Sequence, residues 1–210
     1  MKTLFFRKIR FNCLYEFEGL YPVPEELAYN INCYHLTHDS LDKLVKIEYM
    51  KCGRLNNFSI FNCAVVNIEN SDISRKLTFQ YTMSRRASYK KVTRMEINLE
   101  NNNPVSLYNF DMFDRPTKDY NGIERYFWEQ DKEKGIVHER FTDSEGWEIS
   151  NSIGASKGEY KYDDSGNLIE FRRYNSDGDL TEGLTGYSII KYIYDGNKNL
   201  IQMDYCGNNE

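Results

Sequence analysis

The stretch "YDDSGNLIEF", residues 162–171, decides the fold, because a similar sequence, "YDGNKNLIQM", occurs 32 residues later at residues 194–203. Displacing the chain against itself by the same interval aligns Trp128 with Tyr160 and Tyr192, and Asp131 with Asp163 and Asp195. Self-similarity at a fixed spacing predicts a structural unit that recurs along the chain and buries its apolar face against its neighbours.

The chemistry that the copies of this unit share is that of a tight turn. Gly135, Asn167 and Asn199 share one aligned position. Since Gly and Asn tolerate positive φ best, we predict a left-handed residue there. Four residues earlier, the carboxylates of Asp131, Asp163 and Asp195 are placed to accept hydrogen bonds from the N–H groups of the turn, and Gly166 belongs to this turn in the second copy. Each unit is therefore predicted to be strand, turn, strand.

Composition supports an all-β fold. The chain has 17 Tyr and 12 Phe among its 210 residues, and aromatic residues favour strands. We predict an elongated array of antiparallel β-hairpins with a repeat of about 32 residues. Residues 105–210 form the clear repeats and residues 1–104 form divergent ones, in one continuous domain. The stretch "PVPEELAYN", residues 22–30, is the exception, because Pro24 followed by two glutamates is typical of the first turn of a helix.

The motif at Tyr162, Asp163, Gly166, Asn167 and Leu168 resembles the YD or Rhs-type repeat of bacterial toxin shells and related uncharacterised repeat proteins. The resemblance is partial at 194–200 and extends over residues 105–206. It implies a β-hairpin array used as a shell or as an interaction surface, and it transfers no catalytic residue. The 32-residue period is longer than the usual unit of that family, and Lys198 replaces the glycine in the last copy.

Charge and cysteine content indicate where in the cell the protein is expected to act. The formal net charge is −5, which does not favour nucleic-acid binding, and no apolar run approaches the eighteen residues that a membrane helix needs. The five cysteines are odd in number and irregularly spaced, which favours reduced thiols. We therefore expect a soluble cytoplasmic protein.

A search for catalytic and metal-binding residues leaves no site, so we expect neither an enzyme nor a cofactor. Cys33, His35 and His38 come closest to a metal cluster, but a strand places His38 on the opposite face from the other two. The acidic turns lack the ligand spacing of a calcium loop.

Two groups of residues are candidates for binding. The basic group is Arg85, Arg86, Lys90 and Lys91, whereas the segment 143–182 has ten acids against four bases and is net −6. The aromatic group is Trp128, Tyr160 and Tyr192. The first functional hypothesis is a non-catalytic protein-interaction module, of the inhibitor or immunity type that partners a toxin. The alternative is a carbohydrate-binding module in which the aromatic group forms an exposed ladder for sugar rings.

Two expectations concern the last two copies. Leu168, Ile169, Leu200 and Ile201 are apolar in both copies and are predicted to pack in the interior. The strand around 200–205 is predicted to have no repeat neighbour on its outer side. We expect that edge to be covered by the N-terminal strand near 5–14, by a second copy of the protein, or by a strand from a partner.

Overall fold

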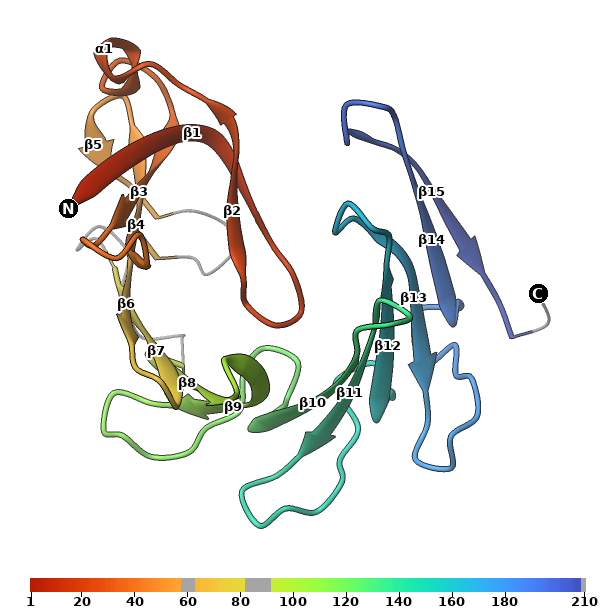
Figure 1. Ribbon diagram of the computed structural model, residues 1–210. Coiled ribbons are helices and arrows are strands. Elements are labelled where there is room, and N and C mark those ends of the chain that lie inside the picture. Colours follow the sequence, from red (N-terminus) through yellow and green to blue (C-terminus); the bar gives the residue numbers. More distant parts are fainter. Residues whose placement is uncertain (58–62, 82–91, 209–210) are drawn as a thin grey trace. The chain divides into compact units, whose positions relative to one another are not determined.

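The computed structural model of the protein describes residues 1–57, 63–81 and 92–208, and their secondary structure is almost entirely β (Figure 1). The elements in chain order are β1 (Lys2–Phe11), β2 (Phe17–Pro22), α1 (Glu25–Ala28), β3 (Cys33–His38), β4 (Leu44–Lys51), β5 (Arg54–Leu55), β6 (Val65–Asn70), β7 (Ser74–Gln80) and β8 (Arg94–Glu100). They continue with β9 (Asn103–Phe110), β10 (Arg125–Asp131), β11 (Ile136–Thr142), β12 (Lys157–Tyr162), β13 (Leu168–Tyr174), β14 (Ile189–Tyr194) and β15 (Leu200–Cys206). The all-β prediction is confirmed, and the short helix lies within the predicted stretch.

These strands form one open antiparallel sheet, in which most strands pair with their neighbours along the chain. The hydrogen-bonded order is β15-β14-β13-β12-β11-β10-β9-β8-β7-β6-β4-β3-β1-β2, and β5 pairs with β4 beside this path. The one exchange is at the N-terminus, where β1 lies between β2 and β3. The described strands at the two ends of the order are therefore β15 and β2.

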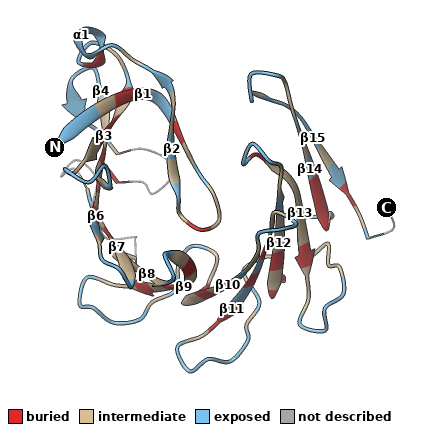
Figure 2. Cartoon of the chain, in the orientation of Figure 1, coloured by how far each residue is buried: buried red, intermediate tan, exposed pale blue. Residues whose placement is uncertain are grey.

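The chain divides into two compact units. The first comprises Met1–Pro104 and Asn109–Arg115, and the second comprises Val105–Tyr108 and Pro116–Glu210. In the first unit, Ile47 on β4, Leu77 on β7 and Ile97 on β8 are completely buried. Buried residues are drawn in red in Figure 2. α1 adds a small cluster of its own, in which Ala28 packs with Phe5 and Cys33.

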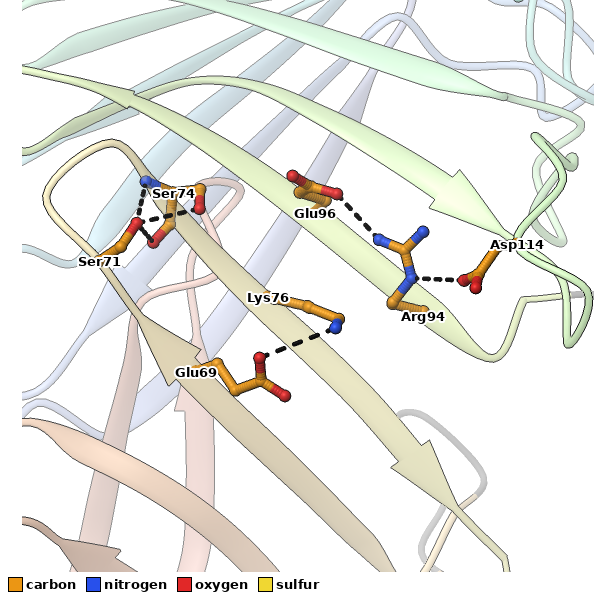
Figure 3. A network of polar contacts seen from close by, with 7 residues as sticks. All are labelled: Glu69, Ser71, Ser74, Lys76, Arg94, Glu96 and Asp114. Atoms are coloured by element: carbon orange, nitrogen blue, oxygen red, sulfur yellow. Dashed lines mark hydrogen bonds and ion pairs between the residues drawn. The ribbon is translucent and has the colours of Figure 1, made fainter.

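The first unit also carries a set of polar side chains on β6, β7 and β8 (Figure 3). Lys76 forms an ion pair with Glu69 on the adjacent strand, at 3.7 Å. Arg94 contacts Glu96 at 2.8 Å and Asp114 at 3.0 Å, and its guanidinium lies 3.8 Å from the centre of the Phe110 ring. The Arg94 side chain is only 15% exposed, whereas that of Asp114 is 78% exposed, so this ion pair connects the 111–115 turn to β8 at the protein surface.

One five-residue turn recurs throughout the described chain. Its first residue is Asp or Asn, whose Oδ1 accepts the N–H of the fifth residue, and its fourth residue has positive φ. The backbone N–H and C=O of the first residue bond to the fifth and fourth residues, respectively. Nine turns have this form, and they begin at Asn12, Asp39, Asp111, Asp119, Asp143, Asn151, Asp163, Asn175 and Asp195.

The prediction of left-handed conformations at Asn167 and Asn199 is wrong, because the left-handed residue is the one before each of them. Gly166 has φ 76° and Lys198 has φ 64°. The two asparagines instead use their side chains, since the Nδ2 group of each donates to Oδ2 of the first aspartate at 2.9 Å. Asparagine at the fifth position is thus explained by hydrogen bonding and not by φ.

Gly135 does have positive φ, at 65°, but it belongs to a different turn. Asp131 pairs directly with Ile136, and its carboxylate is held by the backbone and the ammonium group of Lys134. A Cβ atom at Gly135 would lie 2.7 Å from the carbonyl oxygen of Tyr162, so close backbone approach is a second reason for glycine here.

Lys198 adopts a backbone conformation that glycine adopts without steric penalty, so Lys198→Gly is expected to raise the free energy of unfolding by about 1 kcal/mol. The matched control is Gly166→Ala in the corresponding turn. A Cβ atom there would meet nothing within 4 Å, so the substitution tests only the conformational preference of the backbone. This variant should be less stable by about 1 kcal/mol. Urea denaturation of both variants measures the effect, and equal stability of Lys198→Gly and the parent would contradict it.

Candidate interaction surfaces

The second unit presents two different faces, which follow from the register of its strands. Directly paired residues share a face, and neighbours along a strand point to opposite faces. Trp128 pairs with Glu139, which pairs with Gly158. Val137 pairs with Tyr160, which pairs with Phe171. One face of the sheet is therefore rich in aromatic side chains, and we call it the aromatic face.

A buried carboxylate, Glu139, lies at the centre of the aromatic face. It is 6% exposed. The indole Nε1–H of Trp128 donates to Oε1 at 2.9 Å, and the hydroxyl group of Tyr160 donates to Oε2 at 2.9 Å. Burial raises the pKa of Glu139 to about 7, against the lowering effect of these two hydrogen bonds, and the negative charge of Asp119 adds to the rise. Glu139 can therefore take up a proton near neutral pH.

Asp119 belongs to the same region and shares its chemistry. It opens one of the five-residue turns, and its Oδ2 accepts the hydroxyl proton of Tyr126. Burial raises the pKa of Asp119, while the Tyr126 hydroxyl and the N–H groups of the turn act in the opposite sense. Tyr126 stacks beside Trp128, with ring centres 6.4 Å apart. The turn is thereby fixed to the aromatic face.

The aromatic group singled out from the sequence divides between two environments. Trp128 is 6% exposed and its polar atom is engaged by Glu139, so this ring is part of the core. Tyr160 and Tyr192 are half-buried. Burial, with neighbouring tyrosines, raises the pKa of Tyr192 to about 12. The three rings do not share one solvent-exposed environment.

The opposite face of this unit carries charged side chains and a groove of about 540 Å³. Two cross-strand rows border the groove. The first contains Phe127, Arg140, Lys157 and Tyr174, and the second contains Glu129, His138 and Glu159. Arg140 lies over the ring of Phe127 at 4.4 Å, and His138 is 3.5 Å from Glu159. Because Trp128, Glu139 and Gly158 also line the groove from the row between, their backbone forms its floor.

The connection between β11 and β12 presents a large aromatic side chain to solvent. Trp147 is 71% exposed and closes the turn that begins at Asp143. The carboxylate of Asp143 accepts the N–H groups of Glu145 and Trp147, both at 2.9 Å, and Gly146 supplies the positive φ. The turn is thus held by its own hydrogen bonds while the indole ring stays accessible.

β15 is the second exposed apolar feature of this unit. Leu200 is 46% exposed, Ile201 63%, Met203 37% and Tyr205 54%. The prediction that Leu200 and Ile201 pack in the interior is therefore wrong, whereas Leu168 and Ile169 on β13 are half-buried. The physical reason is position, because β13 has a strand on each side and β15 has only β14. The N-terminal strand does not cover this edge, since β1 pairs with β2 and β3.

The remaining candidate residues do not add to a site. Arg85, Arg86, Lys90 and Lys91 lie outside the described residues. Cys33 donates to the carbonyl oxygen of Ala28 at 3.1 Å, and the His35 ring packs against Phe5 at 4.7 Å. Over the ranges 1–57, 63–81 and 92–208, no three His, Cys, Asp or Glu side chains are grouped to hold a metal ion.

Sequence reasoning missed Glu139 and Trp147. A signal for Glu139 was present, because it alternates with the apolar residues Val137 and Phe141, and the aligned positions 171 and 203 are Phe and Met. A carboxylate in an apolar row predicts a buried, hydrogen-bonded charge. Trp147 had no comparable signal, because a tryptophan beside a turn is compatible with either burial or exposure.

No family model matches the chain, and no curated protein matches it significantly. No helix in the described part of the chain is long and apolar enough to cross a membrane.

Proposed function

We propose that this protein is a non-catalytic β-repeat interaction module that binds a basic protein partner through Trp147 and the acidic side chains around it. The observation that carries the proposal is the 71% exposure of Trp147 on a turn locked by Asp143. Tryptophan is the residue type most enriched among residues that dominate binding energy, and a rigid turn limits the entropy lost on binding.

Charge indicates the kind of partner. Glu145 and Glu148 flank Trp147 and are exposed, and the segment 143–182 has a net charge of −6 from four bases and ten acids. A surface with a net negative charge speeds the encounter with a positively charged protein and disfavours negatively charged competitors. An acidic surface with one aromatic anchor suits a basic protein with an apolar pocket.

The regular spacing of the second unit supports the repeat part of the proposal. β10, β12 and β14 begin at Arg125, Lys157 and Ile189, and β11, β13 and β15 begin at Ile136, Leu168 and Leu200. Each start lies 32 residues after the one before it in its series. An array of such hairpins, related to the YD or Rhs type, would act as an inhibitor or immunity partner of a toxin. No disulfide joins the five cysteines, all of which are described, and this supports action in the reducing cytoplasm.

The proposal predicts that Trp147→Ala weakens partner binding by about thirtyfold or more, because truncating an anchor of this kind removes at least ~2 kcal/mol. The wild-type chain and the variant are used as bait in extract of the native host, with mass spectrometry of the captured proteins. The matched control is Ile73→Ala, which removes an equally exposed apolar side chain, 74% accessible, from the first unit.

The expected result is a basic protein that the wild type and Ile73→Ala retain, and that Trp147→Ala loses. The purified pair should also dissociate as salt is raised, because the acidic surface contributes to binding. Capture of the same proteins by Trp147→Ala and the wild type, in equal amounts, would refute the proposal.

A further inference from the structure

β15 is an unprotected edge among the described strands. Its seven residues, Leu200–Cys206, pair with β14 on one side only. Natural edge strands are usually blunted by charged side chains, above all lysine, by proline or by a bulge. β15 contains no lysine and no proline, its one charged side chain is Asp204, and the register shift with β14 skips Ile201, so the strand pairs regularly from Gln202 to Cys206. Among the described strands, none pairs with the outer N–H and C=O groups of residues 201–205, so these groups can pair with a strand of another molecule.

The strand at the other end of the order, β2, does have such protection. It contains Gly19 and ends at Pro22, and Tyr21 has a positive φ of 58°. A proline removes a donor from the ladder, and a left-handed residue interrupts the extended backbone. β2 is therefore a poor template for β15, and pairing of β15 with β2 of another molecule is not favoured.

The sequence of β15 complements itself in one register. In an antiparallel pair of identical strands related by a two-fold axis perpendicular to the sheet, opposed residues must lie on the same face, so a residue faces its own copy at the centre. With Met203 at the centre, residues 201–205 are all paired. Ile201 then opposes Tyr205 of the second copy, and Gln202 opposes Asp204 of the second copy.

This register also pairs side chains that attract each other. Ile201, Met203 and Tyr205 form an apolar strip on one face, and a β-branched residue opposite an aromatic one is a favourable cross-strand pair. On the other face, Gln202 donates to Asp204 within the strand at 2.8 Å. A primary amide carries two N–H donors, so one remains for Asp204 of the second copy. Centring the pair on Asp204 would oppose two carboxylates, and centring it on Gln202 would place Asp204 against Leu200.

We propose that two copies of this protein associate through β15, antiparallel and in the register centred on Met203, so that their sheets become continuous. The apolar strip of each copy then covers that of the other, and the exposed backbone groups of both edges are paired. This inference is independent of the proposed partner surface, because Trp147 does not belong to β15.

The test is the mass of the 210-residue chain in solution. Light scattering coupled to size exclusion should give twice 24.9 kDa, which is 49.8 kDa. Gln202→Asp places carboxylates opposite one another twice in the dimer and is expected to weaken association roughly tenfold. The double variant Gln202→Asp with Asp204→Gln restores the opposed amide and carboxylate with the same composition, so it should recover the wild-type affinity.

A single cysteine reports the register directly. In a Cys52→Ser background, which removes the exposed thiol, Met203→Cys should form a disulfide-linked dimer under mild oxidation. Ile201→Cys should not, because its counterpart is Tyr205 of the second copy. Because positions 201–203 are exposed, we expect the variants to fold, and circular dichroism checks this. A chain that stays monomeric at all concentrations, or a dimer that neither Gln202→Asp weakens nor Met203→Cys links, would overturn the inference.

Discussion

Replacing Trp128 by alanine is expected to lower the free energy of unfolding by about 3–5 kcal/mol, among the larger effects of any single substitution. The ring is 6% exposed, it stacks beside Tyr126, and it supplies a hydrogen bond to a buried carboxylate. Truncation would leave both a cavity and a carboxylate oxygen without its donor. Chemical denaturation followed by far-ultraviolet circular dichroism measures the loss.

Two variants separate the causes. Trp128→Phe keeps an aromatic ring but removes the N–H donor, so it should lose only ~1–3 kcal/mol. Trp147→Ala removes the other tryptophan of the chain, which is exposed, and should change stability by less than ~0.5 kcal/mol. If Trp128→Ala were as stable as Trp147→Ala, the assignment of Trp128 to the core would be wrong.

The stability of the protein is expected to fall as pH rises through neutrality, because of Glu139. The pKa of this group is about 7 in the folded protein, against an ordinary value of 4.5. A raised pKa means that the folded state binds the proton more tightly than the unfolded state does. The contribution is thus fully present below about pH 4.5 and is lost as pH rises past 7, by about 3 kcal/mol in all.

Glu139→Gln removes this titration and keeps the shape of the side chain. The amide oxygen can accept the Trp128 N–H, and the amide nitrogen can donate to the hydroxyl oxygen of Tyr160. We expect the variant to match the parent near pH 4.5 and to be more stable by about 3 kcal/mol at pH 8.5. Denaturation curves at a series of pH values give this difference, and Glu145→Gln, in an exposed turn, is the control.

The difference in free energy of unfolding between Glu139→Gln and the parent isolates the effect of Glu139 from that of groups whose pH dependence has the opposite sign. His35 is buried against Phe5, and burial lowers its pKa, so its contribution is lost on acidification below pH 6.5. His35 is present in both proteins and cancels in the comparison. A difference that does not change between pH 4.5 and 8.5 would show that Glu139 titrates normally.

The amino-acid sequence was sufficient to predict strands and turns but not the environment of each side chain. The motif at Asp163 and Asp195 predicted carboxylates that cap turns, and both do so, because capping depends only on residues within the turn. The φ assignment failed at Asn167 because asparagine has two uses in a turn, and only the geometry distinguishes its backbone preference from its hydrogen bonding. Local chemistry was therefore predictable where a single interaction decided it.

Burial was harder to predict because it depends on what lies beside a strand. Leu168 and Leu200 have the same neighbours in sequence, yet Leu200 is exposed because no described strand follows β15. Trp128 and Tyr192 occupy aligned positions, yet only Trp128 meets Glu139, whose aligned counterparts are apolar. Recurrence in sequence thus predicted equivalent backbone positions, but each side chain's surroundings differ with the strand that carries it.

The strand order has a consequence for how the chain acquires its structure. From β7 onward, every described strand pairs with the strand that precedes it in the chain, and described turns such as those at Asp163 and Asp195 are closed by their own side chains. Contacts between residues close in sequence form quickly, because little chain entropy is lost in closing the loop. A newly synthesised strand emerging from the ribosome therefore finds its partner already displayed, and the sheet can grow at the pace of translation without waiting for distant segments.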